Sequence, residues 1–269
     1  MIRVLFALIA AVFLTSLDFA EDVPALRLHA AGSLRAAMTD IAQAYSAIYG
    51  TPVNAVFGAS GALGDRLAMG EPGEVFASAD MGNPQALTQA GKAGPTVLFA
   101  HNHLCAIVRP GLDATPSTIL AMMLNPSVKV ATSTPKNDPG GDYAWEMFQK
   151  ADAERPGSRA TLEAKALKIG NVPGSLPVPP SATNAIVWLF HEKRADIFIS
   201  YCTNAGAVAA EFPGVTTVHL PPALAVSAGY GLTVLKGASK DAAQFALFIL
   251  SPAGQGILQK HGFDAPLLP

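Results

Sequence analysis

The chain has 269 residues, of which 50% are hydrophobic and 14% are charged, a composition typical of a folded protein and not of a disordered one. The 18 lysines and arginines and the 20 aspartates and glutamates leave a net charge of −2, so the basic excess that binds nucleic acid or an anionic membrane surface is absent. This length allows two lobes that each bury a core of their own.

The N-terminus has the pattern of a secretory signal peptide. Arg3 precedes an apolar run at 4–14, which is followed by small and polar residues up to Ala20. The run is too short to cross a bilayer, which takes roughly 20 apolar residues. We therefore expect residues 1–20 to be removed on export to the periplasm; a buried N-terminal helix is the alternative.

The two cysteines, Cys105 and Cys202, bear on how the exported chain is held together. Neither follows the leader, where a lipid anchor would be attached, so a freely soluble protein is expected. Both lie in strand-like runs, at 104–108 and 197–202, and outside the cytoplasm they could form a disulfide across a sheet. Two buried thiols are the alternative, and the absence of a C-x-x-C motif argues against a redox or zinc site.

Short strands alternate with amphipathic helices along the first half. Apolar residues recur at helical spacing from Leu34 to Ile48, and the 58–61 segment opens a further helix. The 101–103 segment is expected to be a solvated turn between two extended segments. The expected strands lie at 26–29, 53–57, 75–79, 97–99 and 104–108. Strands that alternate with helices favour an α/β fold with a mainly parallel sheet.

The second half repeats this alternation, with one poorly patterned region. Residues 154–180 are rich in proline, glycine and small polar residues and contain one expected helix near 161–168. Ser251 and Pro252 suit the N-cap and first turn of a closing helix, and Gly262 suits its end. The expected strands lie at 128–131, 196–201 and 233–235, and the other expected helices at 142–151, 183–192, 241–250 and 252–259.

Ser33 and Ser60 stand at equivalent places, each after a strand, beside glycine and at the start of a helix. A helix N-terminus exposes unpaired N–H groups with a partial positive charge, and a serine hydroxyl there can donate to an anion. Two such serines favour an anion site, because the carboxyl ends of parallel strands meet at one edge of an open sheet. The alternative is that both are ordinary N-caps. Similar segments recur at 138–141 and 181–183.

Enzyme motifs are incomplete in the same segments. Residues 58–62 nearly spell the nucleophile elbow G-x-S-x-G, but an alanine stands where the last glycine is needed. No phosphate-binding loop motif occurs, and His101 and His103 lack the further ligands of a metal site. Asp80 is expected to cap the turn that follows its strand. An exported serine hydrolase that uses Ser60 is the minor alternative function.

Several of these blocks together resemble the periplasmic molybdate-binding proteins of ABC uptake systems. The blocks are AAGSL at 30–34, FGASGAL at 57–63, VFASAD at 75–80, DPGGDYA at 138–144, DIFISYCTNA at 196–205, LSPAGQ at 250–255 and GF at 262–263. The resemblance implies a two-lobe periplasmic binding protein fold of type II, an α/β fold in which each lobe is a mainly parallel sheet flanked by helices. The implied first lobe comprises 21–101 plus 226–269, and the second comprises 102–225.

The same resemblance implies a binding site and its partners. The hydroxyls of Ser33, Ser60 and Tyr201 and the backbone N–H groups near Ser60 and at Gly140 and Thr183 would bind one small oxyanion, molybdate or tungstate. Neutral donors suffice for such a dianion in a dry cleft. Sulfate, phosphate or a small organic anion is the alternative ligand on the same fold. The implied protein is a monomer, is not an enzyme, uses no cofactor or metal cation, and delivers its ligand to an ABC transporter membrane permease.

Overall fold

Residues 24–179 and 184–266 are described by the structure, which is a computed structural model. The expected signal peptide at 1–20 and the expected ligand residue Thr183 lie outside the described residues. No helix within the described ranges has the length and apolarity needed to span a bilayer.

Two groups of parallel strands lie at the ends of one hydrogen-bonded path. The strand order is β2-β1-β3-β9-β4-β7-β5-β6, and β8 also pairs with β4. At one end β1 is parallel to β2 and β3, and at the other β5 is parallel to β6 and β7. The expected α/β fold is therefore confirmed, and its sheet is mixed, because β9 and β4 pair antiparallel with their neighbours. The bounds are β1 Leu26–Ala31, β2 Val53–Gly58, β3 Val75–Ser78, β4 Val97–Val108, β5 Val130–Ser133, β6 Leu167–Ile169, β7 Ile197–Tyr201, β8 Thr216–His219 and β9 Ser227–Val234.

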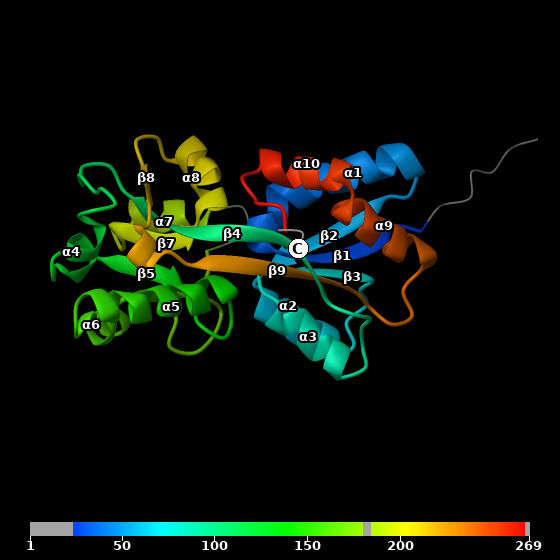
Figure 1. The fold of residues 1–269 in the computed structure, drawn as a ribbon, viewed down its shortest axis with the longest axis horizontal. Coiled ribbons are helices and arrows are strands. Elements are labelled where there is room, and N and C mark those ends of the chain that lie inside the picture. The colour runs from blue at the N-terminus through cyan, green and yellow to red at the C-terminus, as the bar shows by residue number, and fades with distance from the viewer. Residues whose placement is uncertain (1–23, 180–183, 267–269) are drawn as a thin grey trace, which may run out of the picture.

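The long antiparallel strands β4 and β9 connect the two halves. Figure 1 shows them side by side across the middle of the molecule, with β1, β2 and β3 on one side and β5 and β7 on the other. The first part of β4 pairs with β9, and its last part, from Leu104, pairs with β7 and β8. The expected lobe boundaries fall within β4 and just before β9; the division into 21–101 plus 226–269 and 102–225 stays a prediction.

The expected turn at 101–103 is wrong, because β4 runs through it without a break. Asn102 is the reason: its side chain is 1% exposed, and its amide donates to Tyr230 Oη at 3.2 Å and to Thr203 Oγ1 at 2.9 Å. In the sequence a polar residue at this position favours a turn. In the structure it is tolerated in a buried strand, because its hydrogen bonds are all made.

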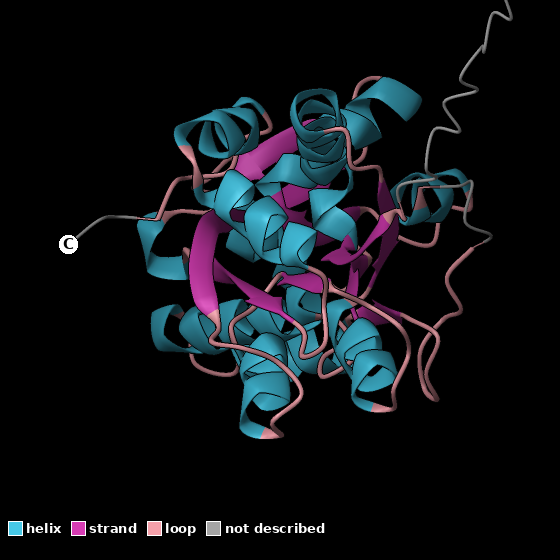
Figure 2. Ribbon diagram, turned by 90° about the vertical axis from the view of Figure 1, so that its right-hand side faces the viewer, coloured by secondary structure: helices cyan, strands magenta, loops and turns pink. Residues whose placement is uncertain are grey.

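Helices flank the strands of each half (Figure 2). Around β1, β2 and β3 lie α1 Arg35–Tyr49, α2 Ser60–Ala68, α3 Gly82–Gln89, α9 Lys240–Leu250 and α10 Pro252–Lys260. Around β5, β6 and β7 lie α4 Ile119–Leu124, α5 Pro139–Glu154, α6 Ser158–Lys165, α7 Ala185–His191 and α8 Ala205–Glu211. The chain therefore leaves the first half along β4 and returns to it along β9, so that its last two helices pack against the first.

The packing of α1 shows how the apolar spacing of the sequence builds the core. Buried residues recur every three or four positions along it, at Ala37, Met38, Ile41 and Tyr45 among others. The Tyr45 ring meets Phe245 of α9 edge-on at 5.0 Å between centroids. Burial of one such large side chain stabilises the fold by about 1.5–3 kcal/mol. The helix ends at Gly50, whose φ of 74° is the left-handed conformation of a C-cap glycine.

The sequence pattern predicts too short a strand for β9, which begins at Ser227 and not near 233. The strand contains Gly229 and Gly231, and glycine weakens the strand pattern. Gly231 is needed for close packing: a Cβ there would lie 2.7 Å from Pro84 Cγ and 2.8 Å from the Asp80 carbonyl oxygen. Asp80 itself behaves as expected, since its carboxylate accepts the backbone N–H of Asn83 at 3.0 Å at the start of α3.

Cys105 and Cys202 form a disulfide, which decides between the two alternatives left open by the sequence. It joins β4 to the first residue of the single-turn helix η2 Cys202–Asn204, which directly follows β7. The bond closes a loop of 97 residues and lies next to Tyr201, the last residue of β7. The Tyr201 segment is therefore covalently tied to the strand that connects the two halves.

Candidate functional site

A cavity of about 890 Å³ lies at the carboxyl ends of the parallel strands from both halves. We call its side from the first half, with Ser33 after β1 and Gly58 at the end of β2, the first wall. We call its side from the other half, with Gly140 after β5 and Tyr201 at the end of β7, the second wall. Ligand sites of open α/β sheets lie at such strand ends, because loops and helix N-termini from several strands converge there.

Three of the five expected ligand residues line this cavity: Ser33, Gly140 and Tyr201. Ser60 is 1% exposed and lies behind the first wall, next to the lining residue Ala59. Thr183 is not among the described residues, and Asn184, which follows it, lines the cavity. The assignment of these five residues to a ligand stays a prediction, and the structure places the described ones in or beside one cavity.

Ser33 lies in the single-turn helix η1 Gly32–Leu34, directly after β1. Its hydroxyl is 2.8 Å from Tyr230 Oη, which also accepts the Asn102 amide. The amide orientation is supported by Asn102 Oδ1, which accepts the His103 backbone N–H at 2.9 Å. If Tyr230 donates its single proton to Ser33, the Ser33 proton is left to donate into the cavity.

Ser60 begins α2, and its hydroxyl oxygen already accepts a hydrogen bond. Its Oγ accepts the backbone N–H of Ala79 at 3.0 Å, which leaves its own proton as a donor. Neither Ser33 nor Ser60 makes a side-chain cap of its helix, so the alternative that both are ordinary N-caps is wrong. Within the described residues no hydrogen bond joins Ser60 to an imidazole.

Gly140 lies in the first turn of α5, and its N–H is already taken. Asp138, the N-cap residue, accepts the Gly140 N–H with Oδ1 at 2.9 Å, and Pro139 takes the first helical position. The neighbouring Gly141 has no room for a side chain, because a Cβ there would lie 2.5 Å from Pro135 N and 2.6 Å from the Ser133 carbonyl oxygen. The close approach fixes the first turn of α5 against the loop after β5.

Tyr201 ends β7 with a side chain that is 4% exposed and a hydroxyl that has no hydrogen-bond partner among the described residues. Its ring meets those of Tyr230 and Tyr143 edge-on, at 5.6 and 6.3 Å between centroids. Burial raises the pKa of Tyr201 well above its usual range, and the nearby Tyr230 and Asp138 raise it further, so the hydroxyl stays protonated. A buried hydroxyl without a partner costs about 1–3 kcal/mol, which a ligand that accepts its proton would recover.

The two cations of the first wall are engaged locally. Arg66 donates to Glu71, and this hydrogen bond, with a second from His29, lowers the pKa of Glu71 to about 2. The Arg35 guanidinium stacks on the Phe57 ring, 4.6 Å from its centroid. The second wall carries the carboxylates Asp138 and Glu211. Stacking uses none of the Arg35 N–H groups, so the cavity offers an anion this guanidinium together with neutral hydroxyl and N–H groups.

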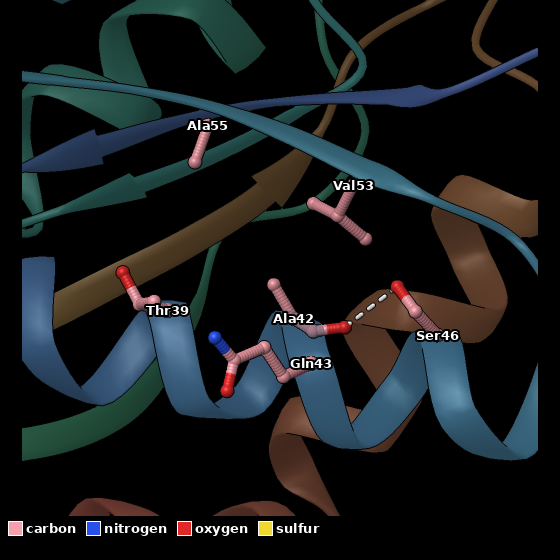
Figure 3. A pocket seen from close by; sticks show the side chains of 6 residues that line it. All are labelled: Thr39, Ala42, Gln43, Ser46, Val53 and Ala55. Atoms are coloured by element: carbon pink, nitrogen blue, oxygen red, sulfur yellow. Dashed lines mark hydrogen bonds between the residues drawn. The ribbon is translucent and has the colours of Figure 1, made fainter.

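A second hollow, of about 420 Å³, lies between α1 and β2 on the outside of the first half (Figure 3). Its polar side chains are Thr39, Gln43 and Ser46. The Ser46 hydroxyl is used inside the fold, since it bonds the carbonyl oxygens of Ala42 and Thr51 at 2.8 and 2.9 Å. This hollow has no charged lining residue and offers little to bind an anion.

A metal-like cluster elsewhere in the described residues consists of Cys105, Cys202 and His219. His219 Nδ1 is 3.5 Å from Cys105 Sγ. The two sulfurs are bonded to each other, and a zinc ligand has to be a thiolate. The cluster is therefore a disulfide with a histidine beside it.

Asn102 and Tyr230 are polar residues beside the site that the sequence did not indicate, and Asp138 was indicated only as part of the 138–141 segment. Asn102 and Tyr230 lie in the connecting strands, where Asn102 sits between two histidines and Tyr230 between two glycines, and both patterns resemble turns. Asp138 carried a signal, because Asp followed by Pro and Gly predicts an N-capped helix. The pattern does not show that this N-cap residue lines the cavity.

Known proteins are similar to this chain in sequence. The family model described as bacterial extracellular solute-binding protein matches residues 26–264. The uncharacterized protein PM1146 of Pasteurella multocida is 30% identical over 239 residues, which cover 88% of this chain and 98% of that protein. The molybdate-binding protein ModA of Mycobacterium tuberculosis is 29% identical over 245 residues, which cover 88% of this chain and 83% of that protein.

Solved structures show the same architecture. The periplasmic molybdate-binding protein of Azotobacter vinelandii has a TM-score of 0.73 at 21% identity and covers 90% of this chain and 100% of its own. The sulfate-binding protein SubI of Mycobacterium tuberculosis has a TM-score of 0.73 at 19% identity and covers 90% of this chain and 86% of its own. The expected two-lobe α/β fold is confirmed, and the anion named for these similar structures differs from one to the other.

Proposed function

The chain belongs to the bacterial extracellular solute-binding proteins, and from this premise we propose that it captures molybdate or tungstate and delivers the anion to an ABC transporter membrane permease. In this proposal the signal peptide at 1–20 directs the chain to the periplasm, where the mature protein acts as a soluble monomer. The protein would release its ligand chemically unchanged, without catalytic residues or cofactors.

The unpartnered Tyr201 hydroxyl carries the proposal. It is buried, protonated and part of the same cavity as Ser33 and Gly140, which come from other strand ends. A fold leaves such a group unsatisfied at a cost, and a binding site is where that cost is recovered. A tetrahedral dianion with four acceptor oxygens is suited to donors that converge from several directions without a cation.

The size of the cavity indicates how the two walls act together. At about 890 Å³ the space is far larger than a five-atom oxyanion. A small ion would leave most of this space open, and fuller contact with both walls needs them to approach each other. The proposed binding step therefore includes closure of the two halves over the ligand, with β4 and β9 as the connecting strands.

Sulfate is the second candidate ligand, favoured by the likeness to SubI. Molybdate and tungstate have longer metal–oxygen bonds than the bonds of sulfate. Fixed donors spaced for the larger ion would leave some of their hydrogen bonds unmade with the smaller one, and each unmade bond weakens the binding of sulfate. Selectivity between these anions would therefore be geometric.

Calorimetric titration of the mature protein with molybdate, tungstate, sulfate and phosphate at one salt concentration tests the proposal. We expect molybdate and tungstate to bind at one site per chain and more tightly than sulfate. A preference for sulfate would move the assignment to the second candidate. An absence of heat with all four anions, in a folded sample, would contradict the proposed function.

A further inference from the structure

We propose that Asp138 couples oxyanion binding to a proton: the cleft accepts a fully ionised tetrahedral anion only with one proton shared between that anion and the Asp138 carboxylate. The inference rests on the proposed function and names the residue that selects among oxyanions.

The position of Asp138 brings a carboxylate to the expected ligand donors. Asp138 lines the cavity together with Gly140 and Tyr201, and its Oδ1 occupies the Gly140 N–H at 2.9 Å. A methyl carbon added at Gly140 would lie 3.4 Å from both Asp138 Oδ1 and Tyr201 Cε2, and 3.5 Å from Ser133 Oγ. An anion bound at the Gly140 N–H would therefore lie against the Asp138 carboxylate.

Like charges at that separation oppose each other strongly in a partly dry cleft. An ionised carboxylate and a dianion in contact favour uptake of a proton by one of them, as in paired carboxylates that share a site. Molybdate, tungstate and sulfate carry no proton at neutral pH, so for them the proton has to reside on Asp138. The protonated carboxyl then donates a hydrogen bond to the anion and no longer repels it.

Several titratable groups lie near Asp138, and the two carboxylates among them favour its protonated form. They are Asp80 after β3, Asp142 in α5, Tyr201 at the end of β7 and Tyr230 in β9, while Tyr143 in α5 and Lys136 in the preceding loop lie near Asp142. Lys136 acts on Asp142, which accepts its backbone N–H at 2.9 Å. Burial raises the pKa of the Asp138 carboxyl, hydrogen bonds from Gly140 and Ser133 oppose the rise, and the charges of Asp142 and Asp80 add to it.

The N-cap role of Asp138 explains why the proton would arrive with the ligand. In the empty cleft the helix N-terminus and the hydrogen bonds from Gly140 and Ser133 oppose the pKa rise caused by burial and thereby favour the ionised carboxylate. The bound dianion reverses this preference, so the pKa of Asp138 rises on binding and the complex takes up a proton. By linkage the affinity for a fully ionised anion then falls as pH rises, by up to tenfold per pH unit above the pKa of the empty protein.

The substitution Asp138→Asn separates the two roles. Asparagine is as good an N-cap as aspartate, so α5 keeps its cap while the charge and the titration are removed. Asp142→Asn is the matched control, because Asp142 lies in the same helical turn and is exposed without lining the cavity. Thermal unfolding of each unliganded variant checks that the fold is kept.

The experiment is a calorimetric titration with micromolar molybdate, and with sulfate, between pH 6 and about pH 9, in buffers of different ionisation enthalpy, which reports the net proton uptake. For the parent we expect uptake approaching one proton and an affinity that falls with pH. Asp138→Asn should bind with no slope and at least tenfold more tightly than the parent at the highest pH, and Asp142→Asn should keep the slope of the parent.

Two results would overturn the proposal in distinguishable ways. Anion binding by the parent without proton uptake, or an equal slope in Asp138→Asn, would contradict the role of Asp138 and leave the proposed function standing. No binding of either anion by the folded parent at any pH would contradict the proposed function, and the role of Asp138 with it.

Discussion

The two walls of the cleft differ in how their polar groups are prepared. In the first wall both serine hydroxyls already have a partner: Ser33 bonds Tyr230, and Ser60 accepts the Ala79 N–H, which leaves the Ser60 proton to donate. In the second wall Tyr201 has no partner among the described residues, and the Gly140 N–H is bonded to Asp138. The first wall can meet an anion without rearranging, whereas the second has to change its hydrogen bonds. We infer that the first wall supplies affinity, and that the second sets release and pH dependence.

The largest expected effect concerns the covalent support of the second wall. Replacement of both Cys105 and Cys202 by alanine opens a loop of 97 residues, and loss of a native disulfide typically lowers the free energy of unfolding by about 2–4 kcal/mol. Urea denaturation of parent and variant measures the change. Because Cys202 follows Tyr201, oxyanion affinity should fall as well. Equal midpoints with equal slopes would show that the disulfide does not support this segment.

Ser33→Ala tests the prepared hydroxyl of the first wall. A hydrogen bond to a charged group contributes about 1.5–3 kcal/mol, so we expect at least a tenfold loss of molybdate affinity with the fold intact, and the same range for Ser60→Ala. Ser46→Ala is the control, because the Ser46 hydroxyl bonds only carbonyl oxygens outside the cleft. Affinities of both cleft variants equal to the parent's would place the site elsewhere.

Tyr201→Phe tests the unpartnered hydroxyl of the second wall. We expect a smaller loss of affinity, about 1–2 kcal/mol, seen mainly as faster release, because the bond exists only once the cleft has closed. The melting temperature of the unliganded protein should not fall, since no hydrogen bond of the described fold is removed. Stopped-flow kinetics measures the release rate, and thermal unfolding measures the melting temperature. A lower melting temperature with an unchanged release rate would assign Tyr201 a purely structural role.

The smallest expected effect is the pH dependence of the Glu71 ion pair in the first wall. The Arg66 hydrogen bond lowers the pKa of Glu71 from 4.5 to about 2, so its contribution to stability is present above pH 4.5 and is lost as pH falls toward 2. Glu71→Gln should therefore lower stability slightly at pH 7 and match the parent near pH 2. Urea unfolding at several pH values measures this. A difference that grows on acidification would contradict the assignment.

Sequence reasoning went furthest where local pattern and function coincide. Ser33, Ser60 and Tyr201 each end a strand or follow one, and the period of the apolar residues placed those strands and the helices after them. Reasoning failed where a long-range contact decides the local structure. Asn102 continues β4 only because Tyr230 and Thr203 receive its amide, and Gly231 of β9 is needed because Pro84 of α3 packs against it. The hydrogen bond from the Gly140 N–H to Asp138 likewise exists only in the folded helix N-terminus, and the sequence does not predict it.

Crystallography with tungstate tests the central claim most directly, that one oxyanion binds between the two walls. Tungsten scatters anomalously, so the ion can be placed independently of the protein atoms. We expect one strong site per chain, with oxygens in hydrogen-bond contact with Ser33 and Tyr201. The two halves should lie closer together than in crystals grown without ligand. A site outside this cavity, or no ordered site at saturating tungstate, would contradict it.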